Sequence, residues 1–227
     1  METNVRFTNG KTLAKKDGVM LSDQAYVIQD GYGPDSYRNA HFRYDRFDIV
    51  NARVQDLVEG GLRVLPTRMT LSGALPDKRY NLHVDMPGTD LKSLNRTIED
   101  VIFAGIGVRL DRKTIDSEVL VLRSTPASAG HLDIAPNGTE SYCRVLTAGD
   151  MVFNCRSGSF DRLARIVEGV LGKRVVNETG LDGSISVTIP VAGQDERSIG
   201  DALQNSLGLT LTPAKRPIEI VFVSAAR

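Results

Sequence analysis

The sequence predicts an α+β protein made of two similar small βαβ-type units, each with helices packed on one face of a mixed sheet. Three observations predict this fold. Apolar residues alternate along several short segments, as in half-buried strands, and recur every three or four residues along others, as in amphipathic helices. The same order of segments then occurs twice along the 227 residues, which are 41% hydrophobic and 25% charged, as in ordinary globular proteins.

The first 123 residues divide into an extension and a unit. Residues 1–40 form an N-terminal extension with little periodic signal, in which a strand is plausible at 25–28. Residues 41–123 form the first repeat unit. Its expected elements are a strand at 47–50, a helix from Val54, a strand at 79–86, a helix that begins at Asp90 and ends at Gly105 and Gly107, and strands at 108–110 and 119–122.

The remainder is expected to hold a linker and a second unit. Residues 124–140 are rich in small residues, Gly and Pro, which is typical of a linker, and residues 141–227 form a hairpin and the second unit. After the hairpin we expect a helix from Ser159 to Gly172, strands at 174–176 and 184–189, a helix from Asp195 to Gly208, and strands at 209–211 and 218–223. Similar residues recur at an offset of about 106 early and about 101 later, which we interpret as an internal duplication. Chance recurrence of a common element order is the alternative.

The two cysteines, Cys143 and Cys155, flank a polar turn that contains Gly149. In a hairpin centred on Gly149 they lie opposite one another, at a separation that a disulfide can span. Two buried thiols are the alternative interpretation. A metal site is not expected, because no histidine or further cysteine lies nearby.

The second unit resembles a known family. Residues 176–183 read Val-Asn-Glu-Thr-Gly-Leu-Asp-Gly, residues 202–211 end a helix in Leu-Gly-Leu, and Pro217 precedes Glu219 in the closing strand. Over 155–227 this pattern resembles the C-terminal half of the soil-associated acidobacterial protein family, a domain of unknown function. Residues 47–123 resemble its first half less closely, and residues 1–40 depart from its usual start.

The element order and the Leu-Gly-Leu helix end also resemble, more distantly, the short N-terminal domains of secretins and TonB-dependent receptors. Those are small interaction modules that work in the periplasm. The resemblance implies a periplasmic or secreted protein and no known reaction. It also agrees with a disulfide between the cysteines.

Few residues suggest chemistry. The three histidines, His41, His83 and His131, lie far apart, and His83 with Asp85 on the outer face of its strand is a weak acid–base candidate. Two charged segments between strands are expected to be hairpin tips, for which solvated turns are the default and partner contact is the functional alternative. The candidate interaction residues at these tips are Asp111, Arg112, Lys113, Lys215 and Arg216.

Composition argues against several classes of function, although a local basic face remains an alternative. Lys and Arg number 28, as do Asp and Glu, so the basic surplus of a nucleic-acid binder is absent. No apolar run approaches the ~20 residues of a membrane-spanning helix, and residues 1–6 lack the pattern of a signal peptide. The chain is therefore cytosolic, or a leader or upstream domain has been removed. With the resemblance, we expect the second case and an extracytoplasmic location.

The leading hypothesis is an extracytoplasmic, non-catalytic module that binds another protein or a peptide, with no cofactor and no metal. Two alternatives are a sensor or accessory domain of a larger membrane-associated protein and a hydrolase of unrecognised type. Nothing in the pattern of residues predicts the oligomeric state.

Overall fold

The computed structural model describes residues 18–22, 25–29, 39–42, 46–126, 134–135, 142–147 and 151–226, with side chains from 46 onward except at 134–135. The described chain divides into two compact units, each with its own hydrophobic core. The first unit holds the described residues up to Lys113 and those from Glu219 onward, and the second is Thr114–Ile218. The protein is therefore a mixed αβ fold, as the sequence predicts.

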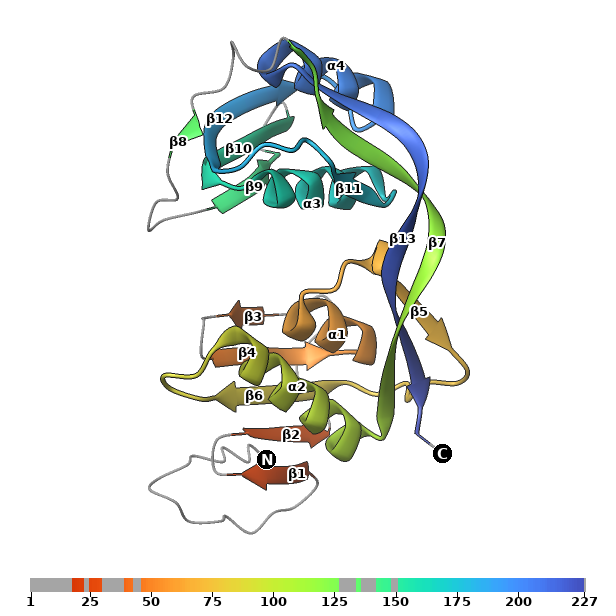
Figure 1. Ribbon diagram of the computed structural model, residues 1–227. Helices are drawn as coiled ribbons and strands as arrows, with labels where there is room; N and C mark the ends of the chain where they lie inside the picture. The colour runs from red at the N-terminus through yellow and green to blue at the C-terminus, as the bar shows by residue number, and fades with distance from the viewer. Residues whose placement is uncertain are drawn as a thin grey trace. The chain divides into compact units, whose positions relative to one another are not determined.

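The first unit contains an antiparallel sheet with two helices packed on one face (Figure 1). Its strands, in order across the sheet, are β1 (Gly18–Ser22), β2 (Ala25–Gln29), β6 (Tyr80–Asp85), β4 (Arg46–Ala52) and β3 (Asn39–Phe42). The helices are α1 (Val54–Leu62) and α2 (Leu91–Ile106). Because β1 and β2 are part of this sheet, the described part of the expected N-terminal extension belongs to the first unit.

The second unit contains a smaller antiparallel sheet and two more helices (Figure 1). Its strands, in order, are β8 (Ile134–Ala135), β12 (Ser184–Val191), β10 (Met151–Gly158) and β9 (Tyr142–Leu146). The helices are α3 (Phe160–Leu171) and α4 (Glu196–Leu207). Part of the expected linker thus forms strand β8, while residues 127–133 and 136–140 lie outside the described residues.

The second helix of each unit begins with the same cap. The side chain of Asp90 accepts a hydrogen bond from the Ser93 amide at 2.7 Å, and that of Asp195 accepts one from the Ser198 amide at 2.9 Å. Such caps satisfy amides that have no partner inside the helix. The helix starts predicted at Asp90 and Asp195 are confirmed.

The strand before the first helix of each unit carries the same irregularity. Asn51 in β4 and Ser157 in β10 have positive φ, 58° and 47°, where the register of each strand pair shifts. The Asn51 amide donates to Oδ1 of Asn81 at 2.8 Å, and the Ser157 amide donates to Oγ of Ser186 at 3.0 Å. A side chain from the neighbouring strand therefore stabilises each bulge at the point where the chain leaves the sheet for the helix.

Two long strands complete the fold. Strands β7 (Val108–Ser124) and β13 (Leu209–Ala225) each span 17 residues and run through both units. They form a sheet in the order β11-β7-β13-β5 with the short strands β11 (Val175–Asn177) and β5 (Met69–Ser72), which pair in parallel with β7 and β13 respectively. A short 3-10 helix, η1 (Pro66–Arg68), precedes β5.

These long strands correct two expectations. The sequence predicts a charged turn within 111–116 and another within 212–217, whereas both segments continue a strand. The side chains of residues 112–116 are exposed on both faces, so they lack the apolar alternation by which a strand is recognised. The division of the chain also differs from the expected units 41–123 and 141–227, because each long strand ends in the other unit.

Candidate functional site at the disulfide-closed sheet edge

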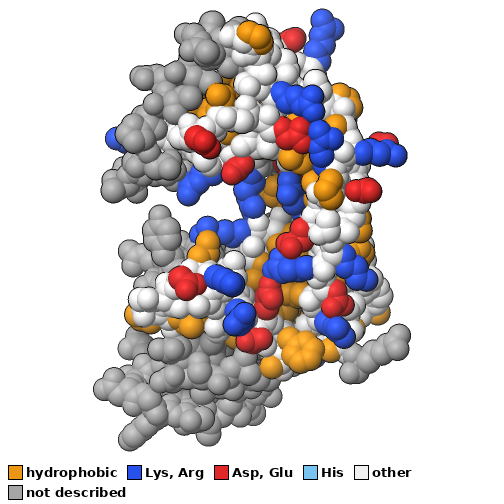
Figure 2. Space-filling view, viewed as in Figure 1, with side chains coloured by type: hydrophobic (Ala, Val, Ile, Leu, Met, Phe, Trp, Pro, Cys, Tyr) orange, Lys and Arg blue, Asp and Glu red, His pale blue; other side chains and the backbone are white. Residues whose placement is uncertain are grey.

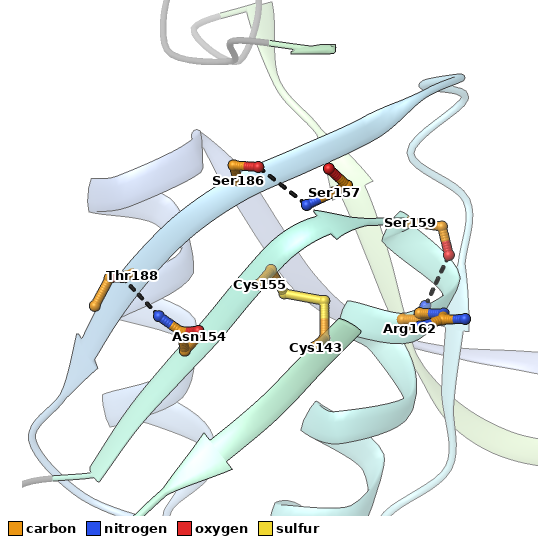
Figure 3. Close-up of a disulfide and its surroundings, with 8 residues drawn as sticks. All are labelled: Cys143, Asn154, Cys155, Ser157, Ser159, Arg162, Ser186 and Thr188. Atoms are coloured by element: carbon orange, nitrogen blue, oxygen red, sulfur yellow. Dashed lines mark hydrogen bonds between the residues drawn. A yellow bond between two sulfur atoms is a disulfide. The ribbon is translucent and has the colours of Figure 1, made fainter. Parts of the chain in front are cut away.

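Strand β9 forms one edge of the second sheet and is joined to β10 by the two cysteines (Figure 3). Cys143 lies directly opposite Cys155, and their Sγ atoms are 2.05 Å apart, the length of a disulfide bond. The predicted hairpin and the facing positions of the two cysteines are confirmed. Cys155 is buried and belongs to the second hydrophobic core, and Cys143 is half-buried and packs against that core.

The pairing at the cysteines fixes which backbone groups of β9 point outward. The two Cα atoms are 4.0 Å apart, the short separation of a non-hydrogen-bonded antiparallel pair. The N–H and C=O of Cys143, and by alternation those of Val145, therefore point away from β10. Among the described strands β9 has a neighbour on one side only, so these groups lie along an edge.

A glycine makes room for the disulfide. A Cβ atom on Gly158 would lie 2.3 Å from Sγ of Cys143 and 3.0 Å from the carbonyl oxygen of Tyr142. Real Cβ atoms do not approach other atoms so closely. Gly158 is therefore required because a larger residue would collide with Cys143, a requirement for which the sequence carries no local signal.

The outer face of the β9–β10 pair combines cationic and apolar side chains. Arg144 and Leu146 on β9 are exposed, and so is Arg156 on β10, which lies opposite Tyr142. The Arg144 guanidinium lies 4.9 Å from the centre of the Tyr142 ring, a cation–π distance. On β10, Asn154 Nδ2 donates to Thr188 Oγ1 at 3.0 Å (Figure 3).

The first sheet places the acid–base candidates on its outer face. Nδ1 of His83 forms a short hydrogen bond with Oδ1 of Asp48, which lies directly opposite on β4. Asp85 lies 3.7 Å from the guanidinium of Arg46, which also donates to Asp48 at 2.5 Å. The histidine thus pairs with Asp48, a carboxylate of the neighbouring strand, and the acid–base pairing of His83 with Asp85 stays a prediction.

Opposing influences act on Asp48. Burial raises its pKa, but hydrogen bonds and charge from His83 and Arg46 outweigh burial and hold the pKa below its usual range.

The other two histidines add no described side chain to this site. His41 takes the register position opposite Asp48 on β3, and His131 lies outside the described residues. Among the described side chains, no three of His, Cys, Asp or Glu gather as metal ligands.

The charged residues expected at hairpin tips lie within the long strands and have partners there. On β7, Arg112 bonds Glu99 of α2 and Glu219 at 3.1 Å, and Lys113 lies 5.2 Å from the Phe222 ring. Asp111 accepts from Arg109 at 3.1 Å. Figure 2 shows basic and acidic side chains interspersed over this part of the surface. Contact with a partner protein at these positions stays a prediction.

Lys215 and Arg216 lie on β13 in the second unit. Arg216 donates to both carboxylate oxygens of Glu178, and Arg123 donates to the same carboxylate at 3.1 Å. The bond from Arg216, with the further bond from Arg123, lowers the pKa of Glu178 to about 2. Lys215 contributes its carbonyl oxygen to the Arg216 guanidinium at 2.8 Å. Glu178 follows strand β11 and had no signal in the sequence, because its partners lie more than 35 residues away in either direction.

No helix in the described part of the chain is long and apolar enough to cross a membrane. No curated protein and no solved structure matches this chain. A family of proteins of unknown function, DUF3738, matches residues 39–226, from the first residue of β3 to the residue after β13. The match takes in both units and nearly all the described residues, so the chain belongs to the DUF3738 family.

Proposed function

We propose that this chain is a non-catalytic protein-interaction module that takes up an extended segment of another protein along strand β9. One observation carries the proposal: β9 directs the backbone groups of Cys143 and Val145 outward, and its own pairing to β10 is fixed by a covalent bond. An incoming strand adds to such an edge through main-chain hydrogen bonds. The disulfide keeps β9 on β10 while the new strand pairs on its other side.

The side chains on the outer face of the β9–β10 pair indicate which kind of partner segment would bind. A strand added beside β9 places every second side chain next to Arg144 and Leu146. Arg156, one strand further in, adds a second positive charge to the same face. An extended segment with acidic side chains, interspersed with apolar ones, complements this surface.

The proposal includes an extracytoplasmic location. Disulfides persist in oxidising compartments and are rare in reducing ones, so a cysteine pair at bonding distance favours the periplasm or the exterior. The resemblance to the soil-associated acidobacterial family and to the short domains of secretins and TonB-dependent receptors supports the same compartment. It also supports an interaction role, since those short domains contact other proteins.

The test measures binding of a synthetic acetylated and amidated octapeptide of alternating Glu and Val by calorimetry at low salt. We expect Val145→Pro to weaken binding about tenfold or more, because proline removes the outward N–H while edge strands tolerate it. Arg144→Glu is expected to abolish binding of this peptide and to create binding of a peptide of alternating Lys and Val.

The control variant leaves strands β9 and β10 unchanged. Thr188→Val on β12 deletes the hydroxyl that accepts a hydrogen bond from Asn154 and is expected to leave the peptide affinity unchanged. Unfolding midpoints of all variants verify that each is folded. Equal affinity of Val145→Pro and the parent protein would show that β9 is not the binding edge, and the proposal would then be wrong.

A further inference from the structure

Each hydrophobic core contains residues from the closing strand of the other half of the chain. The core of the first unit includes Val221 and Val223 of β13, which are 2% and 0% exposed. The core of the second unit includes Leu120 and Leu122 of β7, which are 5% and 0% exposed. Neither core is complete without a strand that begins after the last helix of the other unit.

The pairing of these strands is reciprocal in register. In the first unit Met69 of β5 lies opposite Val221 of β13, and the strands are parallel. In the second unit Val175 of β11 lies opposite Leu120 of β7, again in parallel. These positions correspond at the offsets of the repeat, about 106 for the short strands and about 101 for the closing strands.

The residue after each closing strand donates a hydrogen bond to the glycine that precedes the other closing strand. Strand β7 begins after Gly107, at the end of α2, and its neighbour Thr125 donates its amide to the carbonyl of Gly208 at 3.2 Å. Strand β13 begins after Gly208, at the end of α4, and Ala226 donates its amide to the carbonyl of Gly107 at 2.7 Å. Each strand therefore starts at one helix end and finishes at the other.

We propose that the two units are copies of one module that exchange their closing strands, and that a second copy of this chain can supply β13 in the same way. The strand that pairs with β5 in the first unit is then β13 of the same chain or β13 of the second copy. The contacts at Met69, Gly107 and the first core are the same whichever chain provides the strand. Exchange of an identical element between chains is a low-cost route to a dimer.

Concentration decides between the two arrangements. The chain's own β13 is joined to the rest of the first unit through residues Thr114–Ile218, and we take its effective concentration there as about 1 mM. Refolding at about 10 µM is therefore expected to give monomer with about one per cent of exchanged dimer, and refolding at about 1 mM to give comparable amounts of both. The ratio of exchanged dimer to monomer thus rises about fiftyfold over this range.

The test uses two single variants of the full chain, Ser72→Cys and Ser224→Cys. Ser72 lies opposite Ser224 in the parallel pair of β5 and β13, and neither is fully buried. Equal amounts are unfolded together in urea without reductant, refolded at about 10 µM or about 1 mM, and treated with a short bismaleimide. We expect a covalent dimer that holds one of each variant, with the fiftyfold rise between the two concentrations.

Two controls isolate the exchange. The double variant Ser72→Cys/Ser224→Cys, refolded at low concentration, is expected to be linked within one chain and to remain monomeric. A mixture of Ser72→Cys with Ser206→Cys, whose thiol lies on α4 in the second unit, gives the background of random linkage. A mixed dimer no more abundant than this background at about 1 mM would overturn the proposal.

Discussion

The two antiparallel sheets place different side chains at corresponding positions beside their bulges. Two residues before the bulge residue Ser157, the second sheet has Cys155 opposite Cys143. Two residues before the bulge residue Asn51, the first sheet has Ile49 opposite Ala40. A covalent bond thus closes the edge of the second sheet at a register position where the first sheet has alanine and isoleucine.

The outer faces of the two sheets also carry different side chains beside the bulge. One position further from the bulge, the first sheet has Asp48 opposite His83, which are joined by an ionisable hydrogen bond. The second sheet has Asn154 opposite Thr188, joined by a neutral one. At these positions the two sheets have the same bulge and the same strand pairing but different side chains. The stability change caused by a substitution in one sheet can therefore be compared with that of a substitution at the corresponding position of the other sheet.

The largest effect is expected from removing the disulfide. Cys143→Ala/Cys155→Ala opens a loop with a sequence separation of 12, and such a loop contributes about 3 kcal/mol to the free energy of unfolding. Urea unfolding of the parent and the variant measures the difference. A variant as stable as the parent would show that the edge does not depend on the covalent bond.

Introducing a disulfide into the first sheet tests whether its backbone has the same geometry as that of the second sheet at this position. Ala40→Cys/Ile49→Cys places a cysteine pair at the corresponding register of the first sheet. Ala52 holds the place of Gly158, where a Cβ atom collides with the disulfide, so the graft should close fully only when Ala52→Gly is included. Titration of free thiols after oxidation distinguishes the two variants.

The next effect is expected at Gly158. Gly158→Ala brings a Cβ atom to 2.3 Å from Cys143 Sγ, and overpacking of this kind costs about 1–3 kcal/mol. The cost should fall in the Cys143→Ala/Cys155→Ala background, because the sulfur is gone. Equal costs in both backgrounds, measured as a double-mutant cycle in urea, would assign the effect to the Tyr142 carbonyl instead.

Local patterns allowed the cysteine edge and the helices to be predicted. Cys143 and Cys155 are symmetrical about Gly149, so one short hairpin determines their pairing. Asp90 and Asp195 lie immediately before apolar residues at helical spacing, so each cap is visible in its own segment. Information confined to about 15 residues was enough in these cases.

Longer-range features could not be predicted in the same way. His83 bonds Asp48, 35 residues away, and the sequence does not predict this contact because the register of β4 on β6 cannot be deduced from either strand alone. The exposed middles of β7 and β13 lack alternation and resemble turns. The exchange of strands depends on pairs such as Met69 with Val221, which no local pattern contains.

A smaller effect is expected at Asp48. Its folded-state pKa lies below the unfolded value of 3.8, so its contribution is present above pH 3.8 and is lost as the pH falls through the folded pKa. Asp48→Asn should cost about 1 kcal/mol at pH 7 and flatten the loss of stability in acid. Asn154→Ala in the second sheet should cost a similar amount without this pH dependence. Parallel acid unfolding curves for Asp48→Asn and the parent would contradict the prediction.

The smallest effect is expected at Glu178, where the two units differ once more. Glu178 bonds Arg123 in the second unit, and the corresponding positions in the first are occupied by Ser72 and Ser224. Because the folded pKa of Glu178 is about 2, its pairing is present above the ordinary value of 4.5 and is lost only as the pH falls through about 2.

Glu178→Gln should therefore lower the unfolding midpoint slightly at pH 7 and low salt. The difference should persist at pH 4, and it should disappear in about 1 M salt, where charges are screened over about 3 Å. Ser72→Glu/Ser224→Arg transfers the charged pair to the first unit, and its gain should be equally small and equally sensitive to salt. A salt-independent loss for Glu178→Gln would mean that hydrogen-bond geometry, rather than charge, holds the end of β11 to the closing strands.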